Sequence, residues 1–224
     1  MTGELSFGDI QSLGYETEEI LPRVFKLKNF VTQDELEELF TEANSYSEED
    51  WNYRYLAEMR LHALEKFGRD DLENLKAEGL LEITDNFADK NISVANVQLM
   101  QTLHRRCEEI FNKVGGLDVT GFIVFQRLYA GTELISHFDK YSDKLVEYAA
   151  VLYLNNDYNG GELFFPKFDY EIKPEPGTLI IFPSTEQFEH GVRPVKEGPV
   201  RYVIPVFIKA NHPDGSMAGW ANFG

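Results

Sequence analysis

Two side chains that can bind a metal ion, His137 and Asp139, stand two positions apart at the end of the apolar run ELISHF (133–138). Such a run is typical of a strand, and in an extended chain residues i and i+2 point to the same face. An imidazole and a carboxylate on one face supply two ligands of a mixed nitrogen and oxygen metal site. The triplet is weak alone, because chance supplies about 0.3 of them in a chain with this many histidines and aspartates. A surface histidine beside a loop aspartate gives the same pattern.

A second histidine strengthens the metal hypothesis. His190 lies 51 residues after Asp139, in the seventh of eight expected strands, whereas His137 lies in the second. In a jelly roll these two strands are neighbours around the same mouth. His137, Asp139 and His190 can therefore form a facial set of ligands that leaves three positions open, which indicates non-haem Fe(II) chemistry rather than structural zinc. The remaining histidines are expected to be structural or exposed: His62, His104 and His212.

The elements that must position these ligands are short strands between residues 120 and 210. Runs rich in β-branched and aromatic residues alternate there with Gly, Asn, Asp and Pro clusters, and no helical pattern separates them. This texture favours a sandwich, barrel or jelly roll over a parallel α/β sheet, and eight strands in about 90 residues fit a jelly roll best. The expected strands are GFIVFQRLY (121–129), ELISHF (133–138), EYAAVLYLN (147–155), ELFFP (162–166), YEIK (170–173), TLIIFP (178–183), EHGVRPV (189–195) and VRYVIPVFI (200–208).

The first half of the chain is charged and has helical periodicity. Thr32-Gln33-Asp34-Glu35 is a capping box in front of an apolar stripe, which predicts a helix. A second helix is expected after Ser47, because apolar residues recur there every four positions. These residues are Trp51, Tyr55, Met59, Ala63 and Phe67. Two further helices are expected over 71–79 and over about 93–115, each ending at glycine.

The chain has 224 residues, of which 43% are hydrophobic and 26% charged, a composition typical of a globular protein and not of a disordered one. We expect a single domain over 1–224, with helical support over 1–118, a catalytic jelly roll over 119–210 and a C-terminal tail over 211–224. The expected fold class is α+β. Its core is a double-stranded β-helix, or jelly roll, of about eight strands, with the N-terminal helices packed on one face.

Composition also excludes several partners. No apolar run approaches the length of about 18 residues that a membrane span needs, and the first residues have no basic start or apolar core of a secretory signal. The single cysteine, Cys107, cannot form an internal disulfide, so the cytoplasm is the expected location. Lys and Arg number 21 against 38 Asp and Glu, and the net charge of −17 disfavours nucleic acid as a partner.

Ordered motifs in the β half resemble the 2-oxoglutarate- and Fe(II)-dependent dioxygenases, particularly the prolyl 4-hydroxylase-like branch. His137-x-Asp139, His190 and Arg201 follow one another as in that superfamily, over about residues 120–210. Shorter motifs agree: Tyr129-Ala130-Gly131, Leu152-Tyr153-Leu154-Asn155, GGELFF (160–165), PGTLIIF (176–182) and the lead-in Phe30-Val31-Thr32.

The resemblance implies Fe(II) bound by His137, Asp139 and His190, with 2-oxoglutarate as cosubstrate, dioxygen as the oxidant and ascorbate as a possible reductant. Hydroxylation of a C–H bond is then coupled to release of succinate and CO2. The resemblance assigns the distal carboxylate of 2-oxoglutarate to Arg201, whose planar fork suits a carboxylate, with a hydroxyl from Tyr153. Tyr129 either lines the cosubstrate pocket or packs under its turn.

Alternatives remain open for the anchor. Arg201 follows His190 by eleven residues, where this branch leads us to expect nine or ten, and Arg193 is the rival cation. Both faces of the last strand are apolar, so alternation does not choose the face of Arg201. The segment 140–147 after the ligands is either a lid or a solvated charged turn.

Alternatives also remain open for the function. The favoured substrate is a peptidyl proline, the alternative is a free amino acid or other small metabolite, and a non-catalytic cupin-like metal-binding protein is more remote. Phe207 stands where a nucleic-acid demethylase carries a second arginine, and Asp139 argues against a halogenase, which lacks this carboxylate. Phe138 and Lys140 do not provide the further His or Glu that a cupin usually has beside its first ligand.

Overall fold

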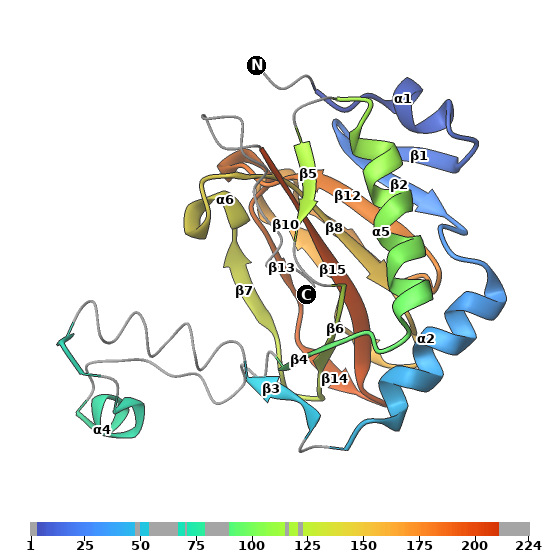
Figure 1. Cartoon of the computed structure of the whole chain (residues 1–224). Helices are drawn as coiled ribbons and strands as arrows, with labels where there is room; N and C mark the ends of the chain where they lie inside the picture. The colour runs from blue at the N-terminus through green and yellow to red at the C-terminus, as the bar shows by residue number, and fades with distance from the viewer. Residues whose placement is uncertain are drawn as a thin grey trace.

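The computed structural model describes residues 4–47, 50–53, 67–69, 71–78, 90–114, 117–120 and 123–210. Two antiparallel sheets lie face to face, and helices cover the outer side of the larger one (Figure 1). The larger sheet has the order β1 (Glu16–Leu21), β2 (Val24–Lys28), β12 (Leu179–Pro183), β8 (Val146–Tyr153), β15 (Arg201–Ala210), β6 (Val124–Leu128), β4 (Lys90–Ser93) and β3 (Asn52–Tyr53), with β5 (Leu117–Thr120) also paired to β15.

The smaller sheet has the order β11 (Tyr170–Ile172), β10 (Leu163–Phe165), β13 (His190–Val192) and β7 (Leu134–His137). A separate pair joins β9 (Asn159–Gly160) to β14 (Val195–Glu197). All eight strands expected from the sequence are present: β6, β8, β12 and β15 in the larger sheet, and β7, β10, β11 and β13 in the smaller. The expected jelly roll is therefore confirmed.

The N-terminal half differs from the helical pattern expected for it, because it also adds strands to the larger sheet. β2 pairs with β12, placing Leu27 opposite Leu179, and β4 pairs with β6. β1 then forms an edge strand rich in glutamate, with half of its residues exposed and the other half partly buried. These strands are short, and their pairing with the core, which local periodicity does not encode, selects the β conformation.

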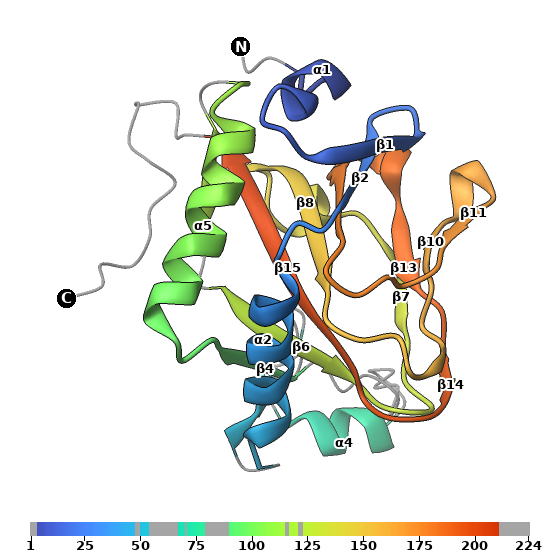
Figure 2. The ribbon, with the colours of Figure 1, turned by 90° about the vertical axis from the view of Figure 1, so that its right-hand side faces the viewer.

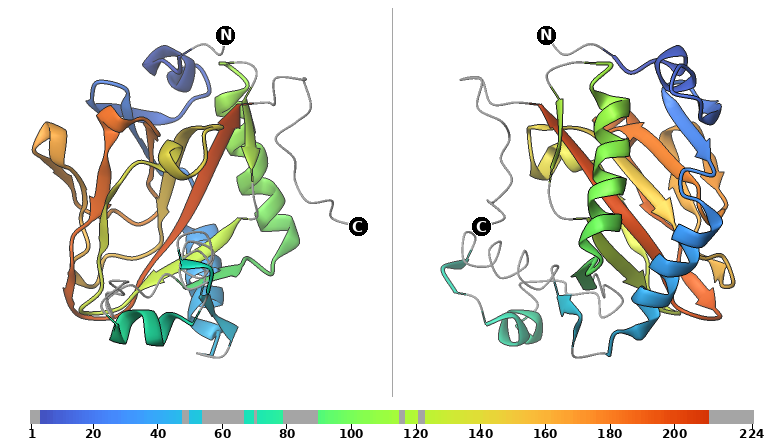
Figure 3. Two further views of the ribbon diagram at one scale, coloured as in Figure 1. Left: turned by 90° about the vertical axis from the view of Figure 1, so that its left-hand side faces the viewer. Right: turned by 45° about the vertical axis from the view of Figure 1, so that its right-hand side comes forward.

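The helices of the N-terminal half are α1 (Phe7–Gln11), α2 (Gln33–Ser45), α4 (Leu72–Ala77) and α5 (Val97–Phe111). Figures 2 and 3 show α2 and α5 lying across the outer face of the larger sheet, as expected. Of the helix expected after Ser47, residues 54–66 lie outside the described residues, and Asn52–Tyr53 is a strand. None of the helices in the described ranges is long and apolar enough to cross a membrane.

The capping box at the start of α2 is present and also joins two helices. The Thr32 hydroxyl accepts from the Glu35 backbone N–H, and the Glu35 carboxylate accepts from the Thr32 backbone N–H at 2.8 Å. The same carboxylate accepts two bonds from the guanidinium of Arg106 on α5, at 2.8 and 2.9 Å. Glu35 therefore fixes the start of α2 and holds α2 against α5.

Replacing Glu35 by alanine is expected to lower the free energy of unfolding by about 2 kcal/mol, since one change removes a cap and half of a partly buried ion pair. Glu35→Gln should cost less, because glutamine also completes a capping box. Urea unfolding measures both values. Glu37→Ala, on the exposed side of α2, is the control and should stay within about 0.5 kcal/mol. Equal stability of Glu35→Ala and wild type would show that Glu35 does not stabilise the start of α2 or its contact with α5.

The two larger hydrophobic cores of the described residues follow from this layering. One lies between the helices and the outer face of the larger sheet, with Leu39, Leu103 and Ile208 among its residues. The other lies between the sheets, where Tyr153, Phe165 and Phe182 are buried. Alternate residues of β8, β12 and β15 belong to one core or the other. The space between the two sheets also contains the site described next.

Candidate metal centre

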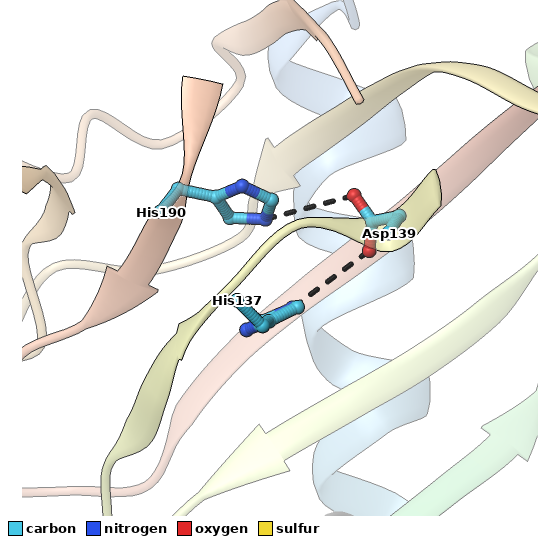
Figure 4. Close-up of side chains that lie close together, drawn as sticks. All are labelled: His137, Asp139 and His190. Atoms are coloured by element: carbon cyan, nitrogen blue, oxygen red, sulfur yellow. Dashed lines mark ion pairs between the residues drawn. The ribbon is translucent and has the colours of Figure 1, made fainter. Parts of the chain in front are cut away.

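Three side chains expected to bind metal meet at one end of the jelly roll (Figure 4). His137 is the last residue of β7, His190 is the first of β13, and the two lie opposite each other in the antiparallel pair. Asp139 begins the short helix α6 (Asp139–Ser142). The Nε2 atoms of His137 and His190 each lie 3.7 Å from an oxygen of Asp139. The ligand atoms of all three residues fall within 4.8 Å of one another.

Backbone carbonyls fix the orientation of both imidazoles. His137 Nδ1 lies 2.8 Å from the Ile135 carbonyl oxygen, and His190 Nδ1 lies 3.1 Å from that of Phe188. A nitrogen facing a carbonyl carries the hydrogen, so each Nε2 of a neutral ring presents a lone pair toward Asp139. Burial lowers the pKa of His190 to about 4, which keeps this ring neutral at pH 7. Two imidazole lone pairs that face one carboxylate fit a bound cation.

The surroundings of the ligands are unequal. His190 is buried, and its ring lies edge to face against Phe182, with centroids 4.5 Å apart. His137 is exposed, so the site opens to solvent on its side. Asp139 faces the hydroxyl of Ser184, which is fully buried and donates to Oδ2 at 3.5 Å. Sequence reasoning missed Ser184, although it directly follows the expected strand 178–183.

Replacing Ser184 by alanine is expected to weaken metal binding by about tenfold, because partners that orient metal ligands typically contribute this much. The fold should be retained, since the backbone hydrogen bonds of Ser184 to Lys140 and Glu147 remain. Titration with Mn(II) in the absence of oxygen measures the affinity. Ser136→Ala is the matched control, because its hydroxyl bonds Glu189 instead. Unchanged affinity in Ser184→Ala would mean that the backbone alone orients Asp139.

A cavity between the sheets connects the metal ligands to Arg201. His137, Asp139 and His190 line it together with Arg201 and mostly apolar side chains. The other lining residues are Gln126, Leu134, Ala149, Ala150, Val151, Leu163, Phe182, Val192, Val203, Pro205 and Phe207. The ligand triad and a cation thus share one cavity whose walls are apolar.

Arg201 is the cation in this cavity. It is 1% exposed and shares the inward face of β15 with Val203, whereas Tyr202 and Ile204 pack in the core beneath the helices. Its Nε donates to the Gly161 carbonyl at 3.2 Å, and its Nη1 is buried without a partner. No carboxylate among the described residues pairs with it. A buried guanidinium with an unpaired nitrogen fits a bound carboxylate, since burying an unpaired charge is costly.

The rival cation and the two tyrosines occupy different places. Arg193 is half-exposed, bonds Glu171 at 2.6 Å and does not line the cavity. Tyr153 is fully buried, and its ring centroid lies 5.4 Å from the Arg201 guanidinium carbon. Tyr129 lies outside the cavity lining, with its ring 4.9 Å from the guanidinium of another arginine, Arg127. The structure thus brings Tyr153 and Arg201 together, while a role for Tyr129 in cosubstrate binding stays a prediction.

The segment 140–147 after the ligands comprises most of α6 and a turn. Lys140 pairs with Glu147 at 2.6 Å, and Asp143 pairs with Lys209 of β15 at 2.7 Å. These contacts tie the segment to the larger sheet. A lid role for it stays a prediction.

The family model of the 2OG-Fe(II) oxygenase superfamily matches residues 123–209, which include the triad, the cavity arginine and the strands that position them. Over this stretch the chain is similar to that superfamily. The resemblance expected from the sequence motifs is therefore confirmed.

Curated relatives match over a shorter stretch. Prolyl 3-hydroxylase 2 of Mus musculus is 40% identical over 57 residues, and prolyl 3-hydroxylase 1 of Gallus gallus is 37% identical over 57 residues. Each match covers 23% of this chain and 8% of the relative. The chain thus matches less than a tenth of the length of these relatives.

Solved prolyl hydroxylases share the fold. The prolyl hydroxylase of Trichoplax adhaerens, in complex with a peptide of the hypoxia inducible factor oxygen degradation domain, has a TM-score of 0.62 at 17% identity and covers 84% of each chain. The viral collagen prolyl hydroxylase of Paramecium Bursaria Chlorella virus-1, in its 2OG complex, has a TM-score of 0.57 at 16% identity, covering 84% of this chain and 96% of that one. A Pseudomonas putida prolyl-4-hydroxylase has a TM-score of 0.52 at 20% identity, with coverage of 84% and 92%.

Proposed function

We propose that this protein is a hydroxylase dependent on Fe(II) and 2-oxoglutarate. One observation carries the proposal: a single cavity holds a His137, Asp139 and His190 triad and, on the same lining, the buried Arg201 with an unpaired nitrogen. A metal that chelates one end of a dicarboxylate and a cation that holds the other end is the arrangement that 2-oxoglutarate requires. The match of residues 123–209 to the superfamily model supports the same assignment.

The residues divide the work between metal and cosubstrate. His137, Asp139 and His190 would hold Fe(II) from one side, with both imidazoles already oriented by backbone carbonyls. Arg201 would neutralise the distal carboxylate of 2-oxoglutarate, and Tyr153 would donate a hydrogen bond to it. Iron held there would supply the oxidative chemistry with dioxygen as the oxidant: one oxygen atom would enter succinate as 2-oxoglutarate loses CO2, and the other would become the hydroxyl of the substrate. The apolar walls keep water away from the cosubstrate.

We propose a peptidyl proline as the substrate. The short curated matches are to prolyl 3-hydroxylases, and the solved relatives include prolyl hydroxylases bound to 2OG and to a peptide. The open side of the metal site supports a large substrate, because His137 is exposed and Ile135 and Tyr141 beside it expose more than half of their surface. An extended segment of another protein can approach such a mouth.

The decisive experiment measures succinate formation from 2-oxoglutarate by the purified, Fe(II)-loaded protein. A panel of proline-containing peptides and free amino acids is offered, and mass spectrometry detects the added oxygen atom. The proposal expects turnover that depends on iron and rises with a proline-containing peptide. Stimulation by a free amino acid alone would redirect the substrate to a small metabolite. Absence of iron-dependent succinate formation under every condition would contradict the activity itself.

A further inference from the structure

A second tyrosine, Tyr158, lies close to Arg201. Tyr158 follows β8 in the chain and precedes β9. It is 7% exposed, and its hydroxyl is buried without a hydrogen-bond partner among the described residues. Tyrosine hydroxyls in a protein interior usually find a partner, because an unmet buried donor is costly. The hydroxyl of Tyr158 is therefore able to donate a hydrogen bond to a bound ligand.

Gly161 brings Tyr158 and Arg201 together. A Cβ atom placed on Gly161 would lie 2.9 Å from Cε2 of Tyr158, closer than real contacts allow, and 3.1 Å from Cδ of Arg201, which is tighter than most. The carbonyl of the same glycine accepts the hydrogen bond from Arg201 Nε. The φ angle of Gly161 is +69°, in the left-handed region that favours glycine. The missing side chain at this position thus lets the ring and the guanidinium stem lie side by side.

Tyr158 also borders the cavity. Tyr158 belongs to the same buried cluster as Val192, against which Leu134 packs, and both Val192 and Leu134 line the cavity. Tyr158 therefore lies next to the part of the cavity wall that Leu134 and Val192 form.

Electrostatics connect the two tyrosines to the arginine. Burial raises the pKa of Tyr153 and of Tyr158, and the positive charge of Arg201 lowers both against this larger rise. The charged form of Tyr153 would raise the pKa of Tyr158 further, so the two hydroxyls influence each other. A hydrogen-bond interaction with the Arg201 side chain also lowers the pKa of each hydroxyl. These contacts do not reach full hydrogen-bond geometry, so both hydroxyls and Arg201 Nη1 stay buried without a complete hydrogen bond. The three groups thus lie close together, and of the three residues Arg201 lines the cavity.

A carboxylate satisfies all three groups at once. It offers about four lone-pair positions, whereas two hydroxyls and one guanidinium nitrogen supply three donors. A water molecule can meet one or two of these donors but brings no charge for Arg201. Carboxylate binding therefore removes both the unmet hydrogen bonds and the unpaired charge.

We propose that Tyr158 is a further binding residue for the distal carboxylate of 2-oxoglutarate, donating a hydrogen bond beside Tyr153 and Arg201. This inference rests on the proposed function and names one more residue of the same site. It also explains the glycine at position 161, whose missing Cβ leaves the space that Tyr158 and Arg201 occupy. A dicarboxylate of the length that reaches from metal to Arg201 is then held at its far end by three donors.

The test compares three tyrosine-to-phenylalanine variants of the full chain, loaded with Mn(II) without oxygen and titrated with 2-oxoglutarate in a calorimeter. Tyr158→Phe should weaken 2-oxoglutarate binding by about tenfold to a hundredfold, the usual effect of one hydrogen bond to a charged group. Its melting temperature without cosubstrate should equal or exceed that of wild type, because phenylalanine leaves no unmet hydroxyl. Its affinity for Mn(II) should not change. Tyr153→Phe should behave alike.

Tyr148→Phe is the matched control, since Tyr148 is also buried but its hydroxyl accepts from the Leu5 backbone N–H at 3.0 Å. It should lower the melting temperature and leave 2-oxoglutarate affinity unchanged, the opposite pattern. Wild-type affinity of Tyr158→Phe for 2-oxoglutarate would overturn the role of Tyr158 but not the proposed function. A loss of Mn(II) affinity in Tyr158→Phe would also overturn this role, because it would place the residue at the metal. Absence of 2-oxoglutarate binding by the wild-type protein overturns the proposed function and this inference together.

Discussion

Replacing His137 by alanine is expected to abolish turnover and to weaken metal binding by more than about a hundredfold. Changes to residues that merely orient metal ligands cost tenfold to a hundredfold, and removal of one of three ligands must cost more. The fold should survive, because His137 lies exposed at the mouth and outside both hydrophobic cores. Mn(II) titration and thermal melting separate the two effects.

The control for this prediction is another histidine. His104→Ala removes a ring that lies on α5 near the Val119 carbonyl and does not line the cavity. It should leave metal affinity unchanged. Full iron-dependent activity in His137→Ala would show that the triad is not the metal site. A zinc ion closed tetrahedrally by four protein ligands would refute the assignment equally, because an oxygenase needs open positions.

The core of the fold was predictable because its signal is local and repeated. Each jelly-roll strand is a short apolar run between turn residues, and antiparallel closure then makes the second and seventh runs neighbours. The register that sets His190 opposite His137 follows from that closure. The capping box before α2 was predictable for the same reason, since it needs only Thr32 and Glu35 three residues later.

Features that depend on tertiary pairing were not predictable. β2 forms where it can pair with the edge of β12, and β1 pairs with β2 in turn. The glutamate-rich sequence of β1 does not distinguish a strand from a loop. The side of β15 on which Arg201 lies is a second example. Both faces of this strand are apolar, and only the packing of the two cores shows which face points into the cavity. The role proposed for Tyr158 was not predictable either. It depends on a buried hydroxyl without a hydrogen-bond partner close to Arg201, and residue spacing in the sequence does not reveal such a contact.

Replacing Arg201 by alanine is expected to weaken 2-oxoglutarate binding by about a hundredfold to a few thousandfold. Removing one partner of a buried ion pair costs about 3–5 kcal/mol, and each 1.4 kcal/mol is about tenfold in affinity. Arg201→Lys should recover part of the loss, because the charge survives but the two-pronged geometry does not. Calorimetric titration of the Mn(II)-loaded protein measures each affinity. Metal binding should be nearly unchanged, since Arg201 is not one of the three residues grouped as metal ligands.

The comparison of Arg201→Ala with Arg193→Ala decides between the two cations that the sequence left open. Arg193 already pairs with Glu171, and its guanidinium carbon lies 4.0 Å from the centroid of the Phe164 ring. Arg201 lies inside the cavity with an unpaired nitrogen, so only it can gain a partner when a carboxylate enters. Arg193→Ala should therefore leave 2-oxoglutarate affinity close to that of wild type. A larger loss in Arg193→Ala than in Arg201→Ala would mean that the cosubstrate binds outside this cavity, and the two-ended arrangement of metal and arginine would have to be abandoned.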